Sequence, residues 1–533
     1  MNVGIGLSVS NFSSVPTVGL DLDAAIAALF SSGEEGAWYD PSDLTTLYQD
    51  AAGTTPVTGT GQPVGLMLDK SKGLTLGAEL VTNGTFDTDT TGWVGNNANA
   101  TLTWQSGSTA LFENVADFAY VRTSASIALT AGKWYRVSFD LIARSHPSAA
   151  FHVGLGVSGN NIGSPGSYSY LYKATGPAEF QIRPNAAGIG TAVFDNISIR
   201  ELPGNHATQS TSTARPTLQV TGTTPATLGS ELVTNGTFDT SSDWTLGTGW
   251  TISGGVAAFA PGTGSLLSQS GTFASSRTYA ISFDISLNGS CSMTVQFSGG
   301  GGSDTAGLLS FGSGSHTVFV STTIARSVIG FSATAVSDFT IDNITIKEVL
   351  TWADPKYYLD FDGVDDFLDA PDIAGLEGIP EMSVCLGAAI PSGTAQQSPV
   401  SKWNDGTLFS WLIDYVSATS RFFVTTGVSG GIATFNVTRD DSVNVSIYRF
   451  KTSNGYLDIN GASVSPSSDT IVATVTRDNN AVVTIGAKKD GATVAGFFSG
   501  PIYGLIIRSA DLDVAELAAT EAYLATKSGV TLP

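Results

Sequence analysis

The 533-residue sequence contains few cysteines, histidines and basic residues, and each shortage excludes a class of protein. Its two cysteines, Cys291 and Cys385, fall in different predicted domains, so the fold must be held together by packing rather than by disulfides. None of its four histidines accompanies a serine or cysteine in a recognisable nucleophile motif, and the HExxH and paired-cysteine metal spacings are absent. Triad hydrolases and zinc sites are therefore not expected.

Basic residues are also scarce, because lysine and arginine total 24 against 46 acidic residues, a formal net charge of −22. A field of that sign repels phosphate backbones and anionic lipid surfaces, so we expect no nucleic-acid partner. No run of 18 apolar residues occurs, and we expect no membrane insertion. The first residues also lack the basic flank and apolar stretch of an export signal.

What the chain has in abundance is glycine, with 61 residues, together with 10% aromatic residues. This composition suits short strands joined by tight turns, and the length favours three or four domains. The most informative feature is an internal repeat, since residues 76–88 read LGAELVTNGTFDT and residues 228–240 read LGSELVTNGTFDT. We predict two copies of one domain, in residues 74–202 and 226–350.

Both copies are predicted to be two-sheet β-sandwiches of the jelly-roll type. Tyr135, Val137, Phe139 and Leu141 alternate with more polar residues, which is typical of a strand with one buried face. The same pattern returns in the second copy, and clusters of glycine, asparagine and serine separate the predicted strands. The expected fold class is therefore all-β.

The ends of each repeat carry a resemblance to a known family. The opening ELVTNGTFD, the tryptophan that follows it (Trp93 or Trp244), and the closing strands FDNISI and IDNITI resemble carbohydrate-binding jelly-roll modules. Such modules are appended to bacterial glycanases and occur in phage structural proteins. The resemblance covers both repeats and implies the jelly-roll fold and, in many members, sugar binding.

The remaining segments resemble a second family. Residues 357–371, YYLDFDGVDDFLDAP, and residues 497–532, a strand followed by an amphipathic helix, are similar to laminin G-like, concanavalin A-like lectin sandwiches. Other parts of that family's pattern lie elsewhere, around Trp38 and in the segment GNHAT at 204–208. We expect His206 in this segment to make a structural hydrogen bond.

We therefore expect both jelly rolls to be inserted into loops of one lectin-like sandwich. That sandwich is predicted to consist of three segments: residues 36–73, 203–225 and 351–533. Insertion predicts that Lys72 lies near Gly204 and that Val220 lies near Pro355. Four domains in a linear string are the alternative.

Residues 1–35 form the remaining segment. Ile26, Leu29 and Phe30 have helical spacing after an acidic start. The segment resembles the particle-anchoring ends of phage fibre and decoration proteins, which implies contacts with other virion proteins. A helix that lies on its own domain is the alternative.

Asp195 and Asp342 each share a strand face with isoleucines that should point inward, and a buried carboxylate needs a cation or hydrogen-bond donors. In the resembling modules the matching aspartate binds a structural calcium ion together with the opening motif. The resemblance thus implies metal ligands Thr85 with Asp195 and Thr237 with Asp342. Capping of the aspartates by backbone N–H groups is the alternative.

Sugar rings stack on exposed aromatic side chains, so the aromatic residues of the first jelly roll are candidate binding residues. Trp134 is expected to point away from the core, and the further candidates are Trp93, Trp104 and Tyr120. For each tryptophan taken singly, a place in the core is the favoured alternative. Thr278 takes the place of Trp134 in the second copy, so equal binding by both copies is not expected.

Together these features predict a virion structural protein, a tail or head fibre or spike, that binds host cell-surface polysaccharide. It would lie on the virion surface, reach the exterior by release in an assembled particle, and act as a homo-oligomer, a trimer by analogy with fibres. A purely architectural decoration protein is one alternative. A polysaccharide-degrading enzyme is the least favoured, because the closely spaced acids of lectin-type glycanases are missing. We therefore do not expect an enzyme.

Overall fold

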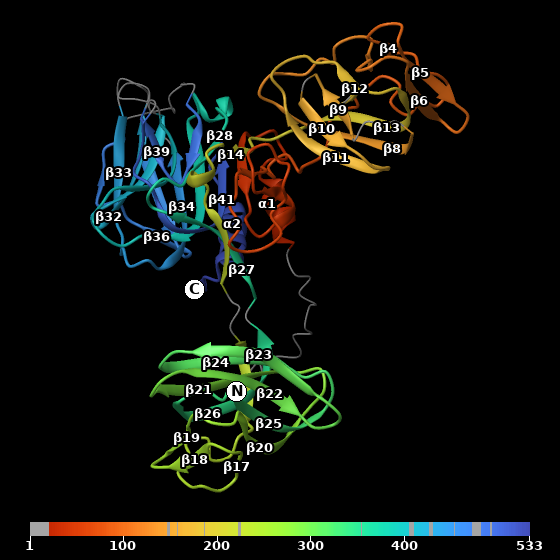
Figure 1. Ribbon diagram of the computed structural model, residues 1–533. Coiled ribbons are helices and arrows are strands. Elements are labelled where there is room, and N and C mark those ends of the chain that lie inside the picture. The colour runs from red at the N-terminus through yellow and green to blue at the C-terminus, as the bar shows by residue number, and fades with distance from the viewer. Residues whose placement is uncertain are drawn as a thin grey trace, which may run out of the picture. The chain divides into compact units, whose positions relative to one another are not determined.

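The computed structural model describes residues 21–145, 150–156, 158–185, 187–221, 225–352, 354–403, 410–425, 430–451, 454–471, 481–490 and 493–533. Within these ranges the chain forms 41 strands, two α-helices and three short 3-10 helices, which confirms the all-β fold class (Figure 1). The 3-10 helices are η1 (Leu44–Thr46), η2 (Ser212–Ala214) and η3 (Ala374–Leu376). The chain divides into two compact units, Val220–Pro355 and the remainder.

The larger unit contains a two-sheet sandwich, the lectin-like sandwich. Its eight-stranded sheet has the order β15-β27-β41-β29-β34-β35-β36, with β1 also paired to β41. The bounds are β1 (Gly36–Tyr39), β15 (Thr217–Thr221), β27 (Lys356–Asp362), β29 (Glu381–Ala389), β34 (Val443–Lys451), β35 (Asn454–Ile459), β36 (Ala462–Val464) and β41 (Ser499–Arg508).

The second sheet of this sandwich has ten strands in the order β2-β3-β14-β28-β38-β30-β31-β32-β33-β37. Their bounds are β2 (Leu47–Tyr48), β3 (Leu66–Met67), β14 (Ala207–Thr208), β28 (Leu368–Ala370), β30 (Gln397–Lys402), β31 (Trp411–Val416), β32 (Thr419–Thr425), β33 (Gly430–Asn436), β37 (Ser468–Asp469) and β38 (Val483–Ile485). A separate hairpin joins β39 (Lys488–Asp490) to β40 (Thr493–Ala495). Inward-facing side chains of both sheets, such as Trp411 and Tyr448, form one core.

Both sheets combine strands from three separate segments of the chain, as insertion requires. Where the first jelly roll leaves the sandwich and returns to it, the Asn205 N–H donates to Oδ2 of Asp69 over 2.7 Å. This contact joins the segment of Lys72 to that of Gly204. Where the second jelly roll begins and ends, β15 and β27 are neighbours in one sheet, which brings the segments of Val220 and Pro355 together.

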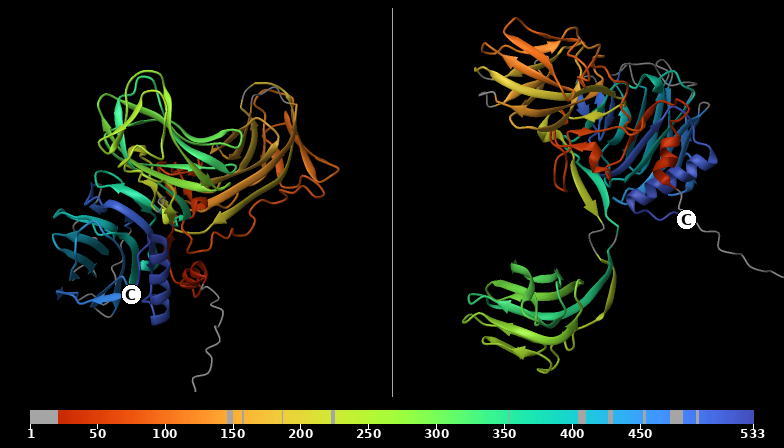
Figure 2. Two further views of the ribbon diagram at one scale, coloured as in Figure 1. Left: turned by 90° about the horizontal axis from the view of Figure 1, so that it is seen from below. Right: turned by 90° about the vertical axis from the view of Figure 1, so that its right-hand side faces the viewer.

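Two helices cover the outer face of the eight-stranded sheet, where they pack against Cys385 of β29, Ile447 of β34 and Ile506 of β41. The α1 helix (Leu22–Ala28) begins at Asp21, whose side chain accepts the Ala24 N–H, and α2 (Val514–Ser528) begins at a capping box of Asp513 and Glu516. Figure 2 shows the two helices side by side. Ile26 is fully buried in the cluster that also holds Trp38, Tyr523 and Leu524.

The helical part of the N-terminal segment is thus part of the lectin-like sandwich. The prediction that residues 1–35 form a separate anchor is wrong for residues 21–35, because their apolar face is buried against the chain's own core. Residues 1–20 lie outside the described residues.

The first jelly roll consists of two five-stranded sheets, β10-β9-β12-β7-β4 and β11-β8-β13-β6-β5. Its strands are β4 (Trp93–Gly95), β5 (Ala100–Gln105), β6 (Thr109–Asn114), β7 (Val121–Thr123), β8 (Trp134–Arg144), β9 (Phe151–Leu155), β10 (Ser158–Ile162), β11 (Gly166–Lys173), β12 (Phe180–Pro184) and β13 (Gly190–Leu202). As predicted, Tyr135, Val137, Phe139 and Leu141 of β8 face the core.

The second jelly roll repeats this topology strand for strand, with sheets β23-β22-β25-β20-β17 and β24-β21-β26-β19-β18. An additional strand, β16, pairs with the end of β26. The bounds are β16 (Pro225–Glu231), β17 (Thr245–Leu246), β18 (Trp250–Ser253), β19 (Val256–Phe259), β20 (Ser265–Phe273), β21 (Thr278–Leu287), β22 (Cys291–Ser298), β23 (Ser303–Phe311), β24 (Gly314–Ser321), β25 (Arg326–Ala333) and β26 (Phe339–Trp352). The predicted duplication therefore extends to every paired strand of the jelly roll.

Candidate functional site

Trp134 lies in a buried joint between the first jelly roll and the lectin-like sandwich. Its side chain is 4% exposed, and the edge of its ring meets the His206 ring at a centroid distance of 6.0 Å. Four leucines complete the joint: Leu66 and Leu68 of the sandwich, and Leu171 and Leu202 of the jelly roll. The prediction that Trp134 points into solvent to bind sugar is wrong, because the neighbouring domain covers this end of β8.

His206 holds the same joint together through hydrogen bonds. The Asp69 N–H donates to Nδ1 over 2.9 Å, and Nε2 lies 3.3 Å from the Leu202 carbonyl oxygen, to which it donates. Burial, with a smaller contribution from nearby lysines, lowers the pKa of His206 to about 4. The expected structural hydrogen bond is confirmed.

Trp93 belongs to the core of the first jelly roll. It is 7% exposed, it packs against Phe86 and Phe180, and its indole N–H donates to the Asn83 carbonyl over 3.1 Å. The ring therefore has no open face for a sugar, and the prediction that Trp93 binds carbohydrate is wrong.

Trp104 and Tyr120 are the predicted aromatic residues that keep contact with solvent. Trp104 lies on the edge strand β5, is 40% exposed, and donates its indole N–H to the Phe86 carbonyl over 2.8 Å. Tyr120 is half-buried and directly precedes β7. Because Val121 points into the core and the Asn96 N–H bonds to the Tyr120 carbonyl, Tyr120 falls on the outer side of its sheet.

Around Tyr120, polar side chains occupy the outer side of the sheet β10-β9-β12-β7-β4. Arg183 lies opposite His152, which lies opposite Asn161, and Gln181 lies opposite Arg122. We call this surface the polar face and define it by six residues: Tyr120, Arg122, His152, Asn161, Gln181 and Arg183. The alternate residues of the same strands fill the core. The core itself therefore does not require these six side chains.

His152 is the most buried member of the polar face. It is 8% exposed, and its Nε2 has no hydrogen-bond partner in the part of the chain that the structure describes. Burial, followed by the charge of Arg183, lowers the pKa of His152, so the imidazole is neutral at neutral pH. A neutral ring with an unsatisfied nitrogen can donate to or accept from a hydroxyl group.

The two arginines of the polar face differ in their partners. Arg122 forms a close ion pair with Glu179, and both side chains are about one-third exposed. Arg183 makes no ion pair with any residue in the described ranges. With a neutral His152, the face carries a net positive charge in a protein whose net charge is −22.

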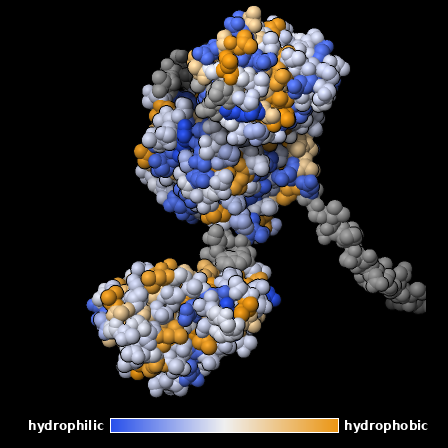
Figure 3. Space-filling view, turned by 45° about the vertical axis from the view of Figure 1, so that its right-hand side comes forward, coloured by the Kyte–Doolittle hydropathy of each residue, from blue (hydrophilic) through white to orange (hydrophobic). Residues whose placement is uncertain are grey.

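The corresponding face of the second jelly roll is different. The same register positions hold Leu266, Ser268, Thr294, Leu308, Gly330 and Ser332, none of which is charged or aromatic. The Leu266 side chain lies over Gly330, since a Cβ atom placed there would be 2.6 Å from its Cδ1. Figure 3 shows the visible surface of this domain, the lower body, as mainly white and orange.

The repeated opening motif has a structural role that the sequence does not reveal. Oε1 of Glu79 accepts the N–H groups of Val81 and Ile199, which ties the opening segment to the closing strand β13. Asn83 and Phe86 both have a left-handed backbone, at φ 55° and 47°. A Cβ atom at Gly84 would meet the Ile197 carbonyl oxygen at 1.9 Å, so only glycine fits.

The second copy repeats each of these features. Oε1 of Glu231 accepts the N–H groups of Val233 and Ile346, and a Cβ atom at Gly236 would lie 2.0 Å from the Ile344 carbonyl oxygen. The motif therefore closes the sandwich in both domains, whatever either domain binds.

The predicted calcium ligands of the first copy lie near converging carboxylates. Asp195 is opposite Asp140 on β8, and Asn196 donates to both, through its N–H and its side-chain amide, over 2.7 Å each. Burial, and then the charges of Asp140 and Asp87, raise the pKa of Asp195. Thr85 and Asn196 line the same hollow of about 300 Å³. A calcium ion takes about six to eight oxygen ligands, so Asp195 and Asp140 supply part of such a set, and neither of them lines this hollow.

In the second copy the equivalent carboxylates have hydroxyl partners. The Thr237 hydroxyl donates to Asp239 over 2.8 Å, and Asp342 lies opposite Asp284. Hydrogen bonds from the side chains of Ser315 and Asn343 lower the pKa of Asp284. The hydroxyl donors are the difference between the copies, since Asn196 and Asn343 make the same contact with Asp140 and Asp284.

Neither predicted pair is part of a compact acidic cluster. Across the described ranges, one group of three such side chains has oxygen atoms within 4.8 Å of one another, namely Asp362, Asp365 and Asp366 in the turn after β27. Asp362 accepts the Val364 N–H, and burial raises the pKa of Asp366 to about 6. Asp366 is only 6% exposed, so this turn is not fully solvated.

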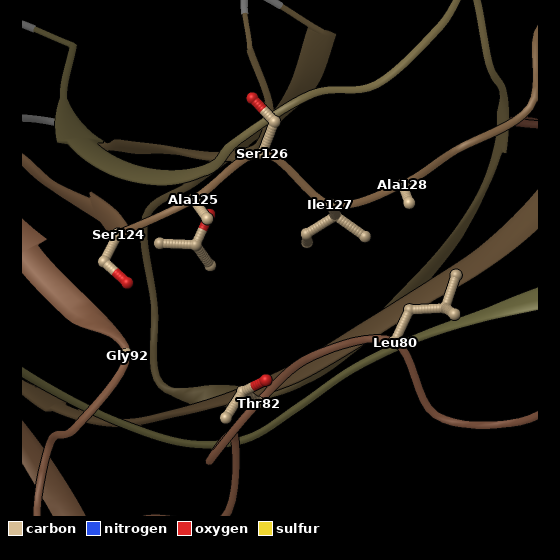
Figure 4. Close-up of a pocket in the computed structure, with 9 residues that line it drawn as sticks. Leu80, Thr82, Gly92, Ser124, Ala125, Ser126, Ile127 and Ala128 are labelled. Atoms are coloured by element: carbon tan, nitrogen blue, oxygen red, sulfur yellow. The ribbon is translucent and has the colours of Figure 1, made fainter.

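A separate hollow of about 250 Å³ lies at the edge of the first jelly roll (Figure 4). Its lining includes Thr82, Ser124 and Ser126 and the aliphatic residues Leu80 and Ile127. None of its lining residues is charged or aromatic, so it lacks the ring and the cation that the polar face presents.

The binding candidates that sequence reasoning missed are Arg122, His152, Asn161, Gln181 and Arg183. Their signal was present, because FHVGL (151–155) and FQIRP (180–184) alternate apolar and polar residues. Tryptophans are the strongest sequence signal for sugar stacking, and alternation within one strand does not show which polar side chains are neighbours across strands.

Comparison with known proteins gives no family assignment, since no protein-family model and no curated protein matches the chain. Similar solved structures include botulinum neurotoxin type C, described as interacting with two ganglioside molecules, at 13% identity and a TM-score of 0.26, covering 32% of this chain and 42% of that chain. The tandem CBM22 domains of Paenibacillus barcinonensis Xyn10C match at 9% identity and a TM-score of 0.19, covering 52% of this chain and 99% of that chain. Mouse laminin α1 domains LG4-5 match at 12% identity and a TM-score of 0.23, covering 51% of this chain and 96% of that chain. At these TM-scores the similarity carries no argument about function.

No helix within the described ranges is both long enough and apolar enough to span a membrane.

Proposed function

We propose that this chain is a glycan-binding adhesion protein that engages saccharide through the polar face of its first jelly roll. One observation carries the proposal: a tyrosine ring, cationic groups, amides and a buried imidazole with a free nitrogen lie together on a sheet surface. Aromatic rings stack on pyranose C–H faces, and polar neighbours orient the hydroxyl groups.

The proposal places the protein on a virion surface, as a fibre or spike that attaches to host polysaccharide. This placement is supported by the combination of two domains that resemble carbohydrate-binding modules with a lectin-like sandwich. Contacts with other virion proteins belong to the same proposal, and α1 is not available for them because it is buried on its own domain. A homo-oligomer, such as a trimer, would multiply one weak site into useful avidity. Light scattering of the full chain and electron microscopy of labelled particles test these points.

The proposal includes no catalytic step. If the chain only binds, incubation with host polysaccharide releases no new reducing ends. Measurable release that grows linearly with protein concentration would instead support the enzyme alternative.

A glycan array probed with the full chain tests the binding proposal directly. Tyr120→Ala should weaken binding to the best glycan about tenfold, because the stacking ring is lost. Tyr456→Ala is the matched control, since Tyr456 is a 43% exposed tyrosine of the lectin-like sandwich. A blank array, or equal binding by both variants, would refute the proposal.

The architectural alternative is favoured for the second jelly roll alone. Its equivalent face has no charge and no ring, and Leu266 covers Gly330. We propose that this copy acts as a spacer or packing element and that the first copy binds glycan.

A further inference from the structure

We infer that the polar face selects saccharides that carry carboxylate groups, and that Arg183 binds the carboxylate. This inference rests on the proposed function and adds the substrate class. Such saccharides are acidic sugars of the uronic or sialic type.

Arg183 is available to a ligand. It alternates with the core residues Ile182 and Pro184 on β12, so its side chain lies on the outer side of the sheet. It forms no ion pair in the described part of the chain, whereas the neighbouring Arg122 is held by Glu179. A guanidinium group matches a carboxylate with two parallel hydrogen bonds, which gives both strength and orientation.

The surroundings of Arg183 suit a sugar better than a free anion. His152, directly opposite Arg183, is more than nine-tenths buried and has an unsatisfied Nε2, which a ligand hydroxyl can complete. Gln181 and Asn161 present amides on the same surface, and Tyr120 supplies a ring. A carboxylate, hydroxyl groups and an apolar ring face occur together in an acidic pyranose.

The charge balance also indicates selection by direct contact. The chain carries a net charge of −22, which repels polyanions at long range. An arginine without an acidic partner is therefore the local feature that makes an anionic ligand acceptable. The equivalent position in the second jelly roll is Ser332, and we expect no such preference there.

The test compares the binding of oligogalacturonate, hyaluronan and oligosialic acid with the binding of their carboxyl-reduced forms, by titration calorimetry of the full chain. At least one acidic form should bind ten-fold or more tightly than its reduced form, and Arg183→Gln should remove that preference. Arg136→Gln is the matched control, because it removes one positive charge from the outer side of the other sheet, on β8. It should leave the preference unchanged.

Two results separate this inference from the proposed function. If the reduced or neutral glycans bind as tightly as the acidic ones, or if the two variants behave alike, carboxylate selection is wrong and glycan binding stands. If no glycan binds although circular dichroism shows an intact fold, both are wrong.

Discussion

The two jelly rolls share their architecture and differ in their surfaces. Ten strands occur in the same order in each, and Glu79 and Glu231 close the two sandwiches with the same backbone contacts. The outer face of one copy carries arginines, a histidine and a tyrosine, whereas the other carries serine, threonine, glycine and leucine. The residues that build the fold and those that face a partner are therefore separable, and duplication of the first set does not imply duplication of the second.

The largest expected difference between the copies lies at the joint. Trp134→Ala removes a ring that fills the contact with the lectin-like sandwich, so we expect a loss of about 3–5 kcal/mol in the opening free energy of β8. Thr278→Ala, at the equivalent place in the second copy, removes a half-exposed side chain and should cost less than about 0.5 kcal/mol. Hydrogen exchange of the β8 and β21 amides measures both. Equal losses would show that Trp134 does not hold the joint.

The joint should also be sensitive to acid. His206 has a folded-state pKa of about 4, below the usual value of 6.5, so the unfolded chain binds the proton more tightly. Stability from this site is complete above about pH 6.5 and is lost as the pH falls toward 4, by on the order of 3 kcal/mol.

Hydrogen exchange of β3 and β8 between pH 4 and pH 7, corrected for intrinsic rates, measures this loss. His206→Gln should flatten the profile, and His316→Gln, in the second copy with a half-exposed ring, should not change it. A wild-type profile that is flat over this range contradicts the assignment.

Stabilisation by calcium should differ less between the two jelly rolls. We expect calcium at one hundred times its dissociation constant to stabilise the first jelly roll by about 2.7 kcal/mol. Asp195→Asn should abolish the shift, because it removes the carboxylate that faces Asp140. Asp342→Asn should leave most of the calcium-dependent shift in place. Thermal unfolding with calcium and with a chelator measures the shift, and an Asp195→Asn protein that still responds fully would rule out this site.

The smallest contrast should be between the two opening motifs. Glu79→Ala and Glu231→Ala each remove an acceptor of backbone N–H groups, so each should cost about 1–2 kcal/mol. Urea unfolding of the two full-length variants, monitored by tryptophan fluorescence, compares the two losses of stability. A difference of more than about 1 kcal/mol between the two variants would mean that the motifs are not equivalent.

The sequence predicted the fold much better than the site. Alternation in β8 and β21 and the repeated ends were sufficient for the sandwiches, because burial of one strand face is a local property. The separated pieces of the lectin-like pattern also predicted the insertion. The burial of Trp134 depends on contact with a neighbouring domain, and the sequence of β8 does not show that contact. The pairing of Arg183 with His152 depends on register between strands about thirty residues apart.

The nested connectivity has a consequence for how the chain reaches its native state during synthesis. Trp38 of β1 lies opposite Ile506 of β41. The first strand of the lectin-like sandwich therefore cannot pair until nearly the whole polypeptide has left the ribosome. Both jelly rolls are contiguous in sequence and can form while that strand is still unpaired. A nascent chain that stalls before residue 499 would carry two finished domains beside an unpaired, apolar strand, and such a species is prone to aggregate.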